Sequence, residues 1–191
     1  MTEMSRFEKW FVNRRGVRPF ERLLARLRGE VRFSLPERAR VLELGAGNGS
    51  FAKLLYETYH PLEVHVTDYD PAQVELARAT LARAYPQVPS AFVVERADAT
   101  RLPYPDASFD LVVAHMMLHH LGDAAAIERG MREIFRVLRP GGRLLYVEAF
   151  HKDLVRSALL RSGLALSYHD SRGFRRWAFH FAEIGIAVRA A

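Results

Sequence analysis

The sequence predicts an α/β fold in which a mostly parallel sheet carries helices on both faces. From Val41 onward, short apolar runs that favour β structure alternate with segments of helical periodicity. A turn with three glycines, Gly45, Gly47 and Gly49, joins the first of these runs to the first helical segment. Alternation of this kind is typical of parallel strands connected by helices.

The predicted elements follow from Val41 in chain order. Runs of β-favouring residues predict strands over 41–44, 63–67, 91–96, 109–114 and 143–149. Apolar residues at helical spacing predict helices over 50–59, 71–84 and 124–138. Arg139-Pro140-Gly141-Gly142 is expected to end the last helix and turn into the next strand, which is a structural task. Residues 173–191 are expected to form two further strands.

Two short helices are expected before this alternating region. Phe7, Trp10 and Phe11 fall at helical spacing in the first of them. Residues 20–31 place apolar side chains on one side and arginines on the other, as an amphipathic helix does.

Composition indicates an ordinary soluble globular protein of one domain. The 191 residues are 49% apolar and 26% charged. No apolar run approaches the roughly 20 residues that cross a bilayer, and the N-terminus lacks the apolar core of a signal peptide. The absence of cysteine excludes disulfides, thiolate metal sites and a cysteine nucleophile. We therefore expect a cytoplasmic protein.

Charge is distributed unevenly along the chain, whose formal net charge is +6. Residues 1–40 carry 11 Lys/Arg against 5 Asp/Glu, residues 41–150 carry 10 against 14, and residues 151–191 carry 7 against 3. The basic ends could meet nucleic acid, an anionic lipid or an acidic small molecule. A solvated arginine-rich surface is the simpler interpretation.

The glycine turn has the features of a ligand-binding loop at the end of a strand. Gly45, Gly47 and Gly49, with Ala46 and Asn48 between them, permit positive φ and remove side chains where a ligand approaches closely. The helix that follows offers unpaired N–H groups to a negative group. The spacing is G-x-G-x-G, whereas the dinucleotide fingerprint G-x-G-x-x-G needs glycine at the next position, which is serine here.

Three acids lie near this turn and near the end of the second strand. Glu43, inside a buried strand, needs a partner because an unpaired buried charge is costly. It could accept from loop N–H groups or, through water, from a ligand ammonium. Asp70 precedes Pro71 and is expected to cap the following helix. Asp68 lies 19 residues beyond Gly49, the spacing at which an acid can bind both hydroxyls of a ribose.

The turns after the second and third strands supply further candidates. Tyr69 could cover an adenine face, or it is a half-exposed surface ring. Asp98 could accept from an adenine amino group while the N–H of Ala99 donates to a ring nitrogen. The alternative for Asp98 is the ordinary role of an aspartate in a turn.

Three histidines follow the fourth strand. His115 and His119 are four residues apart and would share a face of a helix. They could form a two-ligand metal set, but zinc sites need three or four ligands and no third is apparent, so we expect no metal. His115 is expected beside a cofactor, whereas His119 and His120 are packing or substrate-facing residues.

These segments together resemble the class I S-adenosylmethionine-dependent methyltransferases, in particular the ubiquinone/menaquinone-biosynthesis type (methyltransferase type 11). The matching segments, in order, are Val41–Gly49, Thr67–Pro71, Asp98–Ala99 with Leu102–Pro103, Phe109–Val113 and Leu138–Leu144. They cover roughly residues 38–150. The order and spacing of the five segments, more than any single one, carry the resemblance.

The resemblance implies a role for each matching position. The Gly45–Gly49 loop would hold the methionine part of S-adenosylmethionine, and Asp68 the ribose hydroxyls. Asp98 and Ala99 would contact the adenine. His115 falls where the family places a residue facing the methionine end, although that position is often a small polar residue in the family. His115 and His119 are therefore the candidate catalytic bases, since histidine titrates near neutral pH.

The resemblance also implies an architecture. It is a Rossmann-like three-layer sandwich with a mostly parallel seven-stranded sheet, an antiparallel C-terminal strand and extra N-terminal helices. Residues 1–191 would form a single methyltransferase domain. Residues 1–37 would be a helical cap over the substrate pocket, residues 38–150 the cofactor-binding core, and residues 151–191 a C-terminal helix and strand pair.

The predicted activity is methyl transfer from S-adenosylmethionine to a small molecule such as a quinone or lipid, leaving S-adenosylhomocysteine. The alternatives are an NAD(P)-dependent oxidoreductase, which shares the fold and Asp68, and a non-catalytic S-adenosylmethionine-binding module. The basic segment 20–31 could lie on an anionic membrane, or it packs on its own domain. The sequence argues against a nucleic-acid substrate, because it lacks interleaved aromatic and basic residues.

Overall fold

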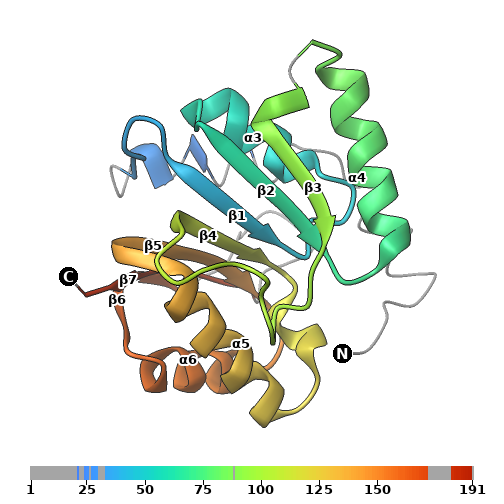
Figure 1. The fold of residues 1–191 in the computed structure, drawn as a ribbon. Coiled ribbons are helices and arrows are strands. Elements are labelled where there is room, and N and C mark those ends of the chain that lie inside the picture. The colour runs from blue at the N-terminus through green and yellow to red at the C-terminus, as the bar shows by residue number, and fades with distance from the viewer. Residues whose placement is uncertain are drawn as a thin grey trace. The chain divides into compact units, whose positions relative to one another are not determined.

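The computed structural model describes residues 33–87, 89–171 and 182–190, together with residues 21, 24–25 and 27–29. Residues Glu3–Arg96 and Ala97–Ala191 form two compact units, here called the N-terminal unit and the C-terminal unit. The colours of Figure 1 follow the chain from blue through green to red, so the two units can be traced separately.

The N-terminal unit is built on three parallel strands. They are β1 (Arg40–Leu44), β2 (Glu63–Asp68) and β3 (Phe92–Arg96), and β2 is paired with both neighbours. Leu44 is opposite Thr67, and Asp68 is opposite Arg96, so the carboxyl ends of the strands lie together. Figure 1 shows the three strands side by side with their arrowheads at one edge.

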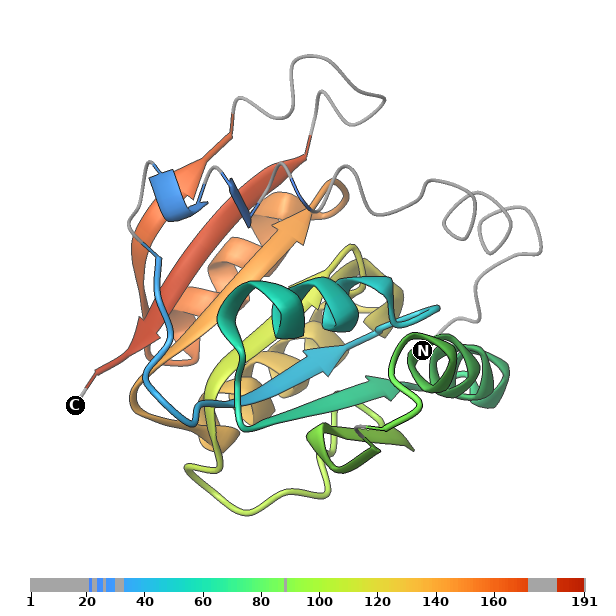
Figure 2. The ribbon, with the colours of Figure 1, turned by 90° about the horizontal axis from the view of Figure 1, so that it is seen from above.

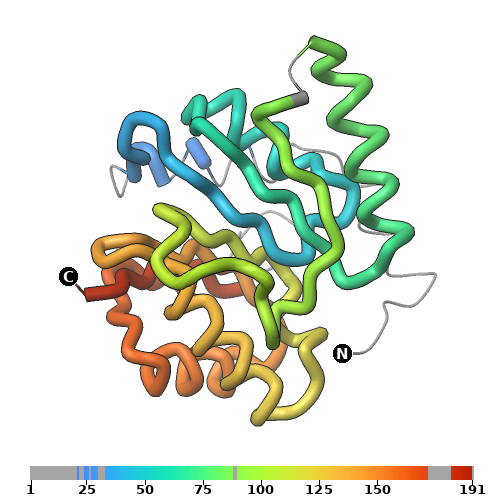
Figure 3. Tube along the Cα trace, in the orientation of Figure 1, coloured from blue at the N-terminus to red at the C-terminus, as the bar shows by residue number. Residues whose placement is uncertain are grey.

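Two helices connect these strands, and local signals set where each begins. The first, α3 (Ser50–Tyr59), follows Gly49, which takes a left-handed conformation. The second, α4 (Pro71–Ala84), has proline in its first turn and is capped by Asp70, whose side chain accepts from the N–H of Ala72 at 2.9 Å. The tube in Figure 3 follows the chain from α3 through β2 into α4. A short 3₁₀ turn, η1 (Pro89–Ala91), then leads into β3.

The core of the N-terminal unit is apolar and almost fully buried. Its side chains come from β1, β2, α3 and α4. They are Val41, Leu42, Leu44, Phe51, Leu55, Val64, Val66, Val74 and Leu81. An aromatic cluster of Tyr56, Tyr85 and Phe92, with ring centroids 5.0–5.5 Å apart, packs beside α3.

The C-terminal unit holds four strands of mixed direction. The parallel pair is β4 (Phe109–His115) and β5 (Leu138–Glu148). The strand β7 (Glu183–Arg189) runs antiparallel to β5 and to β6 (Leu164–Asp170). The order within the unit is therefore β4-β5-β7-β6. The register of β4 against β5 shifts between Phe109 and Leu111, where the Arg139–Gly142 segment bulges out.

Three helical elements accompany these strands. They are the 3₁₀ turn η2 (Leu118–Leu121), α5 (Ala124–Val137) and α6 (Lys152–Arg161). Asp123 caps α5 by accepting from the N–H of Ala126 at 2.8 Å. The buried stripe of α5 contains Ile127, Met131 and Ile134, which are fully buried. Figure 2 shows β5 and β7 side by side with α5 and α6 along one face.

The predicted strands and helices between residues 40 and 137 are confirmed, with boundaries that differ by one or two residues at most. The prediction for the C-terminal tail was wrong in part. Among the described residues 182–190 the strand is β7, and its antiparallel partner β6 begins earlier than expected, at Leu164, directly after Gly163 with φ 94°. The fifth strand was expected to begin at residue 143, but β5 begins at Leu138. Residues 138–142 belong to β5 because the strand continues through the bulge.

The predicted N-terminal helices lie mostly outside the described residues. Phe7, Trp10 and Phe11 are outside them altogether. In the second helix, positions 21, 24–25 and 27–29 are helical, and Leu24 and Leu27 are buried.

Candidate functional site

The backbone of the glycine loop in the N-terminal unit has positive φ angles, which residues with side chains rarely adopt. Gly45, Gly47 and Gly49 have φ of 65°, 55° and 74°. The N–H of Ala46 donates to the carbonyl of Thr67 at 2.9 Å, which ties the loop to the end of β2. Gly49 donates to Ala46 at 3.0 Å and closes the turn. The loop is thus held in one shape at the carboxyl ends of β1 and β2.

Close packing adds a second reason for glycine at position 49. A Cβ on Gly49 would lie 3.1 Å from the Cβ of Ala77 in α4. A Cβ on Gly47 would lie 3.8 Å from Oε1 of Gln73. Within the loop, the side-chain oxygen of Asn48 accepts from the N–H of Ser50 at 3.1 Å and so orders the first turn of α3.

Asp68 is held by the loop that precedes it in sequence. Its Oδ2 accepts from the N–H of Gly47 at 3.0 Å, and its Oδ1 accepts from the N–H of Asp70 at 2.9 Å. Burial raises the pKa of Asp68, while these backbone N–H groups act in the opposite direction. A carboxylate oxygen has two lone pairs, so each oxygen of Asp68 keeps the capacity to accept from a hydroxyl.

Glu43 is the most unusual group in this unit. Its side chain is 2% exposed, and its Oε2 has no hydrogen-bond partner in the part of the chain that the structure describes. Burial raises the pKa of Glu43 to about 8, with the charge of Asp68 acting in the same direction. The loop therefore leaves one of the two carboxyl oxygens without a donor. A buried acceptor of this kind favours a donor from a ligand or water.

Gln73 is a residue that the sequence analysis missed. It lies in the first turns of α4, is 5% exposed, and its Oε1 is directed toward Gly47 without a partner among the described residues. The sequence could have revealed it. Gln73 lies four residues before Ala77 and next to Val74, so its helical spacing places this polar residue on the buried side of α4. Glu43, Gln73 and Asp68 together make the inner side of the glycine loop rich in acceptors.

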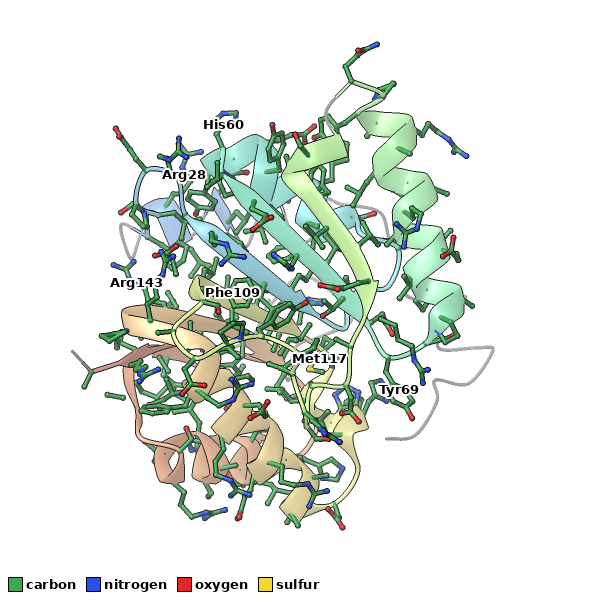
Figure 4. All side chains as sticks on the ribbon, viewed as in Figure 1. Arg28, His60, Tyr69, Phe109, Met117 and Arg143 are labelled. Atoms are coloured by element: carbon green, nitrogen blue, oxygen red, sulfur yellow. The ribbon has the colours of Figure 1, made fainter. Side chains whose placement is uncertain are left out.

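Tyr69 follows β2 at the edge of the N-terminal unit, where Figure 4 labels it. It is half-buried, and the guanidinium of Arg96 lies 4.9 Å from the centre of its ring. Nε of the same arginine donates to the carbonyl of Tyr69 at 2.9 Å. Arg96 thus fixes the position of the tyrosine.

In the C-terminal unit, Asp98 shapes the turn that follows β3 in sequence. Its Oδ1 accepts from both the N–H and the hydroxyl of Thr100, at 2.8 and 2.7 Å. The turn packs against α5, since a Cβ on Gly130 would lie 3.6 Å from the carbonyl oxygen of Ala99 and 2.7 Å from a methyl of Leu121. The predicted turn role of Asp98 is therefore real, and it uses one of the two carboxylate oxygens.

His115 ends β4, and the chain turns sharply after it. Met116 has φ of 52°, and its N–H donates to the carbonyl of Val147 at 2.8 Å. Burial lowers the pKa of His115 to about 4, and the charge of Glu148 opposes this shift. His115 is therefore neutral at physiological pH. Figure 4 labels Phe109 at the start of β4 and Met117 beyond its end.

His119 pairs with an acid that the sequence analysis also missed. Its Nδ1 lies 2.6 Å from Oε1 of Glu148, which ends β5 and is fully buried. Glu148 thus contacts the ring of His119 and its charge also acts on His115, and the ring centroids of His119 and His120 are 4.1 Å apart. The signal for Glu148 was the one noticed for Glu43, an acid within a run of apolar strand residues.

The described residues offer neither a metal cluster nor a membrane-spanning helix. Among residues 33–87, 89–171 and 182–190, no three histidines or acids gather where they could hold a metal ion. In the same part of the chain, no helix has the length and apolar character to span a bilayer.

Comparison with known proteins gives the class of protein. Residues 42–146, more than half of the chain, match the protein family described as "Methyltransferase domain". The chain therefore belongs to this family of methyltransferase domains.

Two curated relatives are similar over this region. The demethylmenaquinone methyltransferase of Deinococcus radiodurans is 39% identical over 109 residues, which are 57% of this chain and 42% of that protein. The 27-O-demethylrifamycin SV methyltransferase of Amycolatopsis mediterranei is 42% identical over 126 residues, 65% of this chain and 44% of that protein. The chain spans less than half the length of these two relatives.

A solved structure agrees over nearly the whole chain. A SAM-dependent methyltransferase from Aquifex aeolicus matches with a TM-score of 0.77 at 15% identity, covering 98% of this chain and 100% of that chain. The likeness establishes the fold. The predicted Rossmann-like class, with seven mostly parallel strands and antiparallel strands at the C-terminal end, is confirmed.

Proposed function

We propose that this protein binds S-adenosylmethionine and transfers its methyl group to a small-molecule acceptor. The observation that carries the proposal is the glycine loop, whose Gly47 N–H holds the carboxylate of Asp68 at 3.0 Å. Membership of the methyltransferase-domain family supports the same activity. The bound cofactor supplies an electrophilic methyl group on a sulfonium sulfur, and the protein aligns donor and acceptor.

In the N-terminal unit, we assign the methionine and ribose parts of the cofactor. The loop Gly45–Gly49, including Ala46 and Asn48, would hold the methionine tail. Glu43 would accept from its ammonium group, directly or through water, with the oxygen that has no partner among the described residues. Asp68 would bind the ribose hydroxyls, and Tyr69 would cover the adenine. The unpartnered buried acceptors fit a ligand that brings hydrogen-bond donors, and they do not suit a pyrophosphate.

In the C-terminal unit, we assign the adenine contacts and the catalytic histidines. Asp98 would accept from the adenine amino group with the oxygen that its turn does not use, and the N–H of Ala99 would donate to the ring. His115 would face the methionine end of the cofactor. His115 and His119 are the candidate bases for an acceptor that must lose a proton.

The acceptor is proposed to be a small metabolite of the quinone, lipid or polyketide kind. The relatives named above carry names that refer to demethylmenaquinone and 27-O-demethylrifamycin SV. Residues 1–37 are proposed to cap the substrate pocket, residues 38–150 to bind the cofactor and residues 151–191 to complete the domain. We also propose that the protein is cytoplasmic and that its basic segment 20–31 contacts an anionic membrane.

The proposal is tested by substitution of the ribose-binding acid. Asp68→Asn keeps the shape of the side chain and removes its charge, so binding of S-adenosylhomocysteine should weaken by about 10- to 100-fold. Glu75→Gln on α4, whose side chain is 72% exposed, is the matched control and should bind like the wild type. The measurement is the thermal shift and calorimetric affinity for S-adenosylhomocysteine. Unchanged affinity of Asp68→Asn would remove the ribose assignment.

A further inference from the structure

Glu148 is placed to orient another side chain. It is fully buried at the carboxyl end of β5, accepts three backbone hydrogen bonds and contacts the ring of His119. Its Oε1 accepts from the N–H groups of Ala149 and Phe150, at 2.8 and 3.1 Å, and lies 2.6 Å from Nδ1 of His119. Its Oε2 accepts from the N–H of His119 at 3.2 Å. Such a set of backbone donors holds the carboxyl group in one orientation.

His119 is fixed by this carboxylate at both its backbone and its ring. The ring also meets the edge of Phe150, with centroids 4.9 Å apart, and lies against His120. The side chain of His119 is 13% exposed, so one part of the ring reaches beyond the packed protein. The residue lies in η2, just past the end of β4, where open α/β sheets bind their ligands.

The hydrogen-bond pattern determines which ring nitrogen carries the proton. A carboxylate can only accept, so in the contact with carboxylate Glu148 it is Nδ1 of His119 that donates. In a neutral imidazole the other nitrogen, Nε2, then carries a lone pair and is the basic atom. His115 is less suited to the same task, because burial lowers its pKa to about 4 and it holds a proton poorly near neutral pH.

We propose that Glu148 is a positioning residue that holds His119 with Nδ1 protonated, so that Nε2 of His119 accepts the proton of a hydroxyl acceptor during methyl transfer. The inference rests on the proposed function and deepens it by naming the acceptor class. The acceptor oxygen bonds to the methyl carbon as the carbon–sulfur bond breaks, and the electron pair of that bond stays on sulfur. The acceptor proton passes to Nε2 and is released to solvent after the product leaves.

A hydroxyl is the acceptor for which this arrangement is most useful. A neutral amine already carries the lone pair that attacks the methyl carbon. A thiol has a pKa of about 8.5 and is partly ionised near neutral pH, whereas a phenol has a pKa of about 10. A hydroxyl acceptor therefore gains most from a base that is already oriented when it binds.

The tautomer can be measured without any acceptor. In protein with ¹⁵N-labelled histidine, the His119 signals are assigned by comparison with His119→Gln. Nδ1 is expected to carry the proton and Nε2 to show the shift of an unprotonated nitrogen, both in free protein and with S-adenosylhomocysteine. In Glu148→Gln the carboxylate no longer enforces this tautomer, and the Nε2-protonated form should increase. Nε2 protonated in the neutral wild-type ring would overturn the proposal.

The second readout is methyl transfer from labelled S-adenosylmethionine. The acceptors are hydroquinones, phenols and aliphatic alcohols, with matched anilines and thiophenols for comparison. We expect methyl ethers as products. His119→Ala should lose at least about 100-fold in kcat, and free imidazole should restore part of it. Glu148→Gln should lower kcat by about 10- to 100-fold with little change in KM. His60→Asn, an exposed histidine with φ 47° where asparagine is tolerated, is the matched control.

The outcomes separate this inference from the proposed function. Failure of the wild type to bind S-adenosylhomocysteine would contradict the proposed function itself. Two results would overturn the inference alone, with normal binding of S-adenosylhomocysteine. One is full turnover in His119→Ala, and the other is a panel in which amines or thiols are methylated and hydroxyls are not. If Glu148→Gln does not fold, the ring tautomer of the wild type and the turnover of His119→Gln still test the proposal, because the side chain of His119 is not fully buried.

Discussion

At the scale of single residues, the N-terminal unit concentrates buried acceptors around the glycine loop. Glu43 Oε2 and Gln73 Oε1 lack partners among the residues that the structure describes, and Asp68 is bound only by backbone N–H groups. Buried polar atoms without partners cost about 1–3 kcal/mol each, which fits the proposal that a ligand supplies donors to this loop. Of these groups, the carboxyls of Glu43 and Asp68 make the unit sensitive to pH.

The first prediction concerns Glu43 and the pH dependence of stability. Its folded pKa of about 8 lies above the unfolded value of 4.5. The protonated form is favoured by folding, so the stability it contributes is complete below pH 4.5 and is lost as the pH rises to about 8. The loss approaches at most about 1.4 kcal/mol for each pH unit within this window.

Glu43→Gln is neutral at every pH and should remove this dependence. Urea unfolding of both proteins at pH 5, 6, 7 and 8 measures the effect. The free energy of unfolding of the wild type should fall relative to that of Glu43→Gln as the pH rises. Parallel curves for the two proteins would show that Glu43 is not held protonated by burial.

At the scale of elements, two local devices hold the C-terminal unit together. One is the end of α5, where Nη1 of Arg189 donates to the carbonyls of Phe135, Arg136 and Leu138 at 3.1, 3.1 and 2.6 Å. These carbonyls lie in the last turn or just past it and have no partner within the helix. The strand β7 thereby caps a helix that precedes it by some 50 residues.

We predict that Arg189→Met destabilises the protein by about 1–2 kcal/mol. The substitution keeps much of the apolar stem and removes the donors that satisfy the helix end. Arg132→Met on the exposed face of α5, 62% exposed, is the control and should change stability by less than about 0.5 kcal/mol. Chemical denaturation measures both, and equal effects would contradict the capping role.

The second device is the contact between Gly185 of β7 and the ring of Tyr146 in β5. A Cβ on Gly185 would overlap this ring, whose hydroxyl donates to Glu183 at 3.2 Å and which is itself fully buried. Only glycine leaves room for the tyrosine at this point of the antiparallel pair.

Gly185→Ala should therefore destabilise the protein by about 1–3 kcal/mol, the usual cost of overpacking. Gly29→Ala is the control, because a Cβ there meets nothing within 4 Å. The melting temperatures of the two variants give the comparison. A melting temperature for Gly185→Ala equal to that of the wild type would show that the ring can move aside at little cost.

Sequence predicted those elements whose limits are set locally. The start of α4 follows from Asp70-Pro71, and that of α3 from Gly49, so both helices were placed correctly. The start of β5 and the position of β6 depend on pairing with residues far along the chain, and local propensity does not reveal that register. Gln73 and Glu148 were missed because their burial depends on the packing of neighbouring elements, although each is a polar residue in an apolar stretch.

At the scale of the whole molecule, the family and the fold are established, whereas the acceptor is not encoded in a recognisable motif. The methyltransferase family matches residues 42–146, and the fold agrees with a solved structure over 98% of the chain. The residues proposed to bind the cofactor lie in or near the glycine loop, the end of β2 and the turn that contains Asp98. The order of the motifs along the sequence had already pointed to these three segments. Sequence also named His115 and His119 as candidate bases, and the structure adds Glu148 as the partner of His119.

The most direct test of the central claim is calorimetric titration of the wild-type protein with S-adenosylhomocysteine, 5′-methylthioadenosine and NAD⁺. We expect one S-adenosylhomocysteine bound for each chain with Kd of about 1–100 μM, within the range of KM values common for enzyme substrates. Methylthioadenosine, which lacks the amino-acid end, should bind more weakly, and NAD⁺ more weakly still. Tighter binding of NAD⁺ than of S-adenosylhomocysteine would contradict the account.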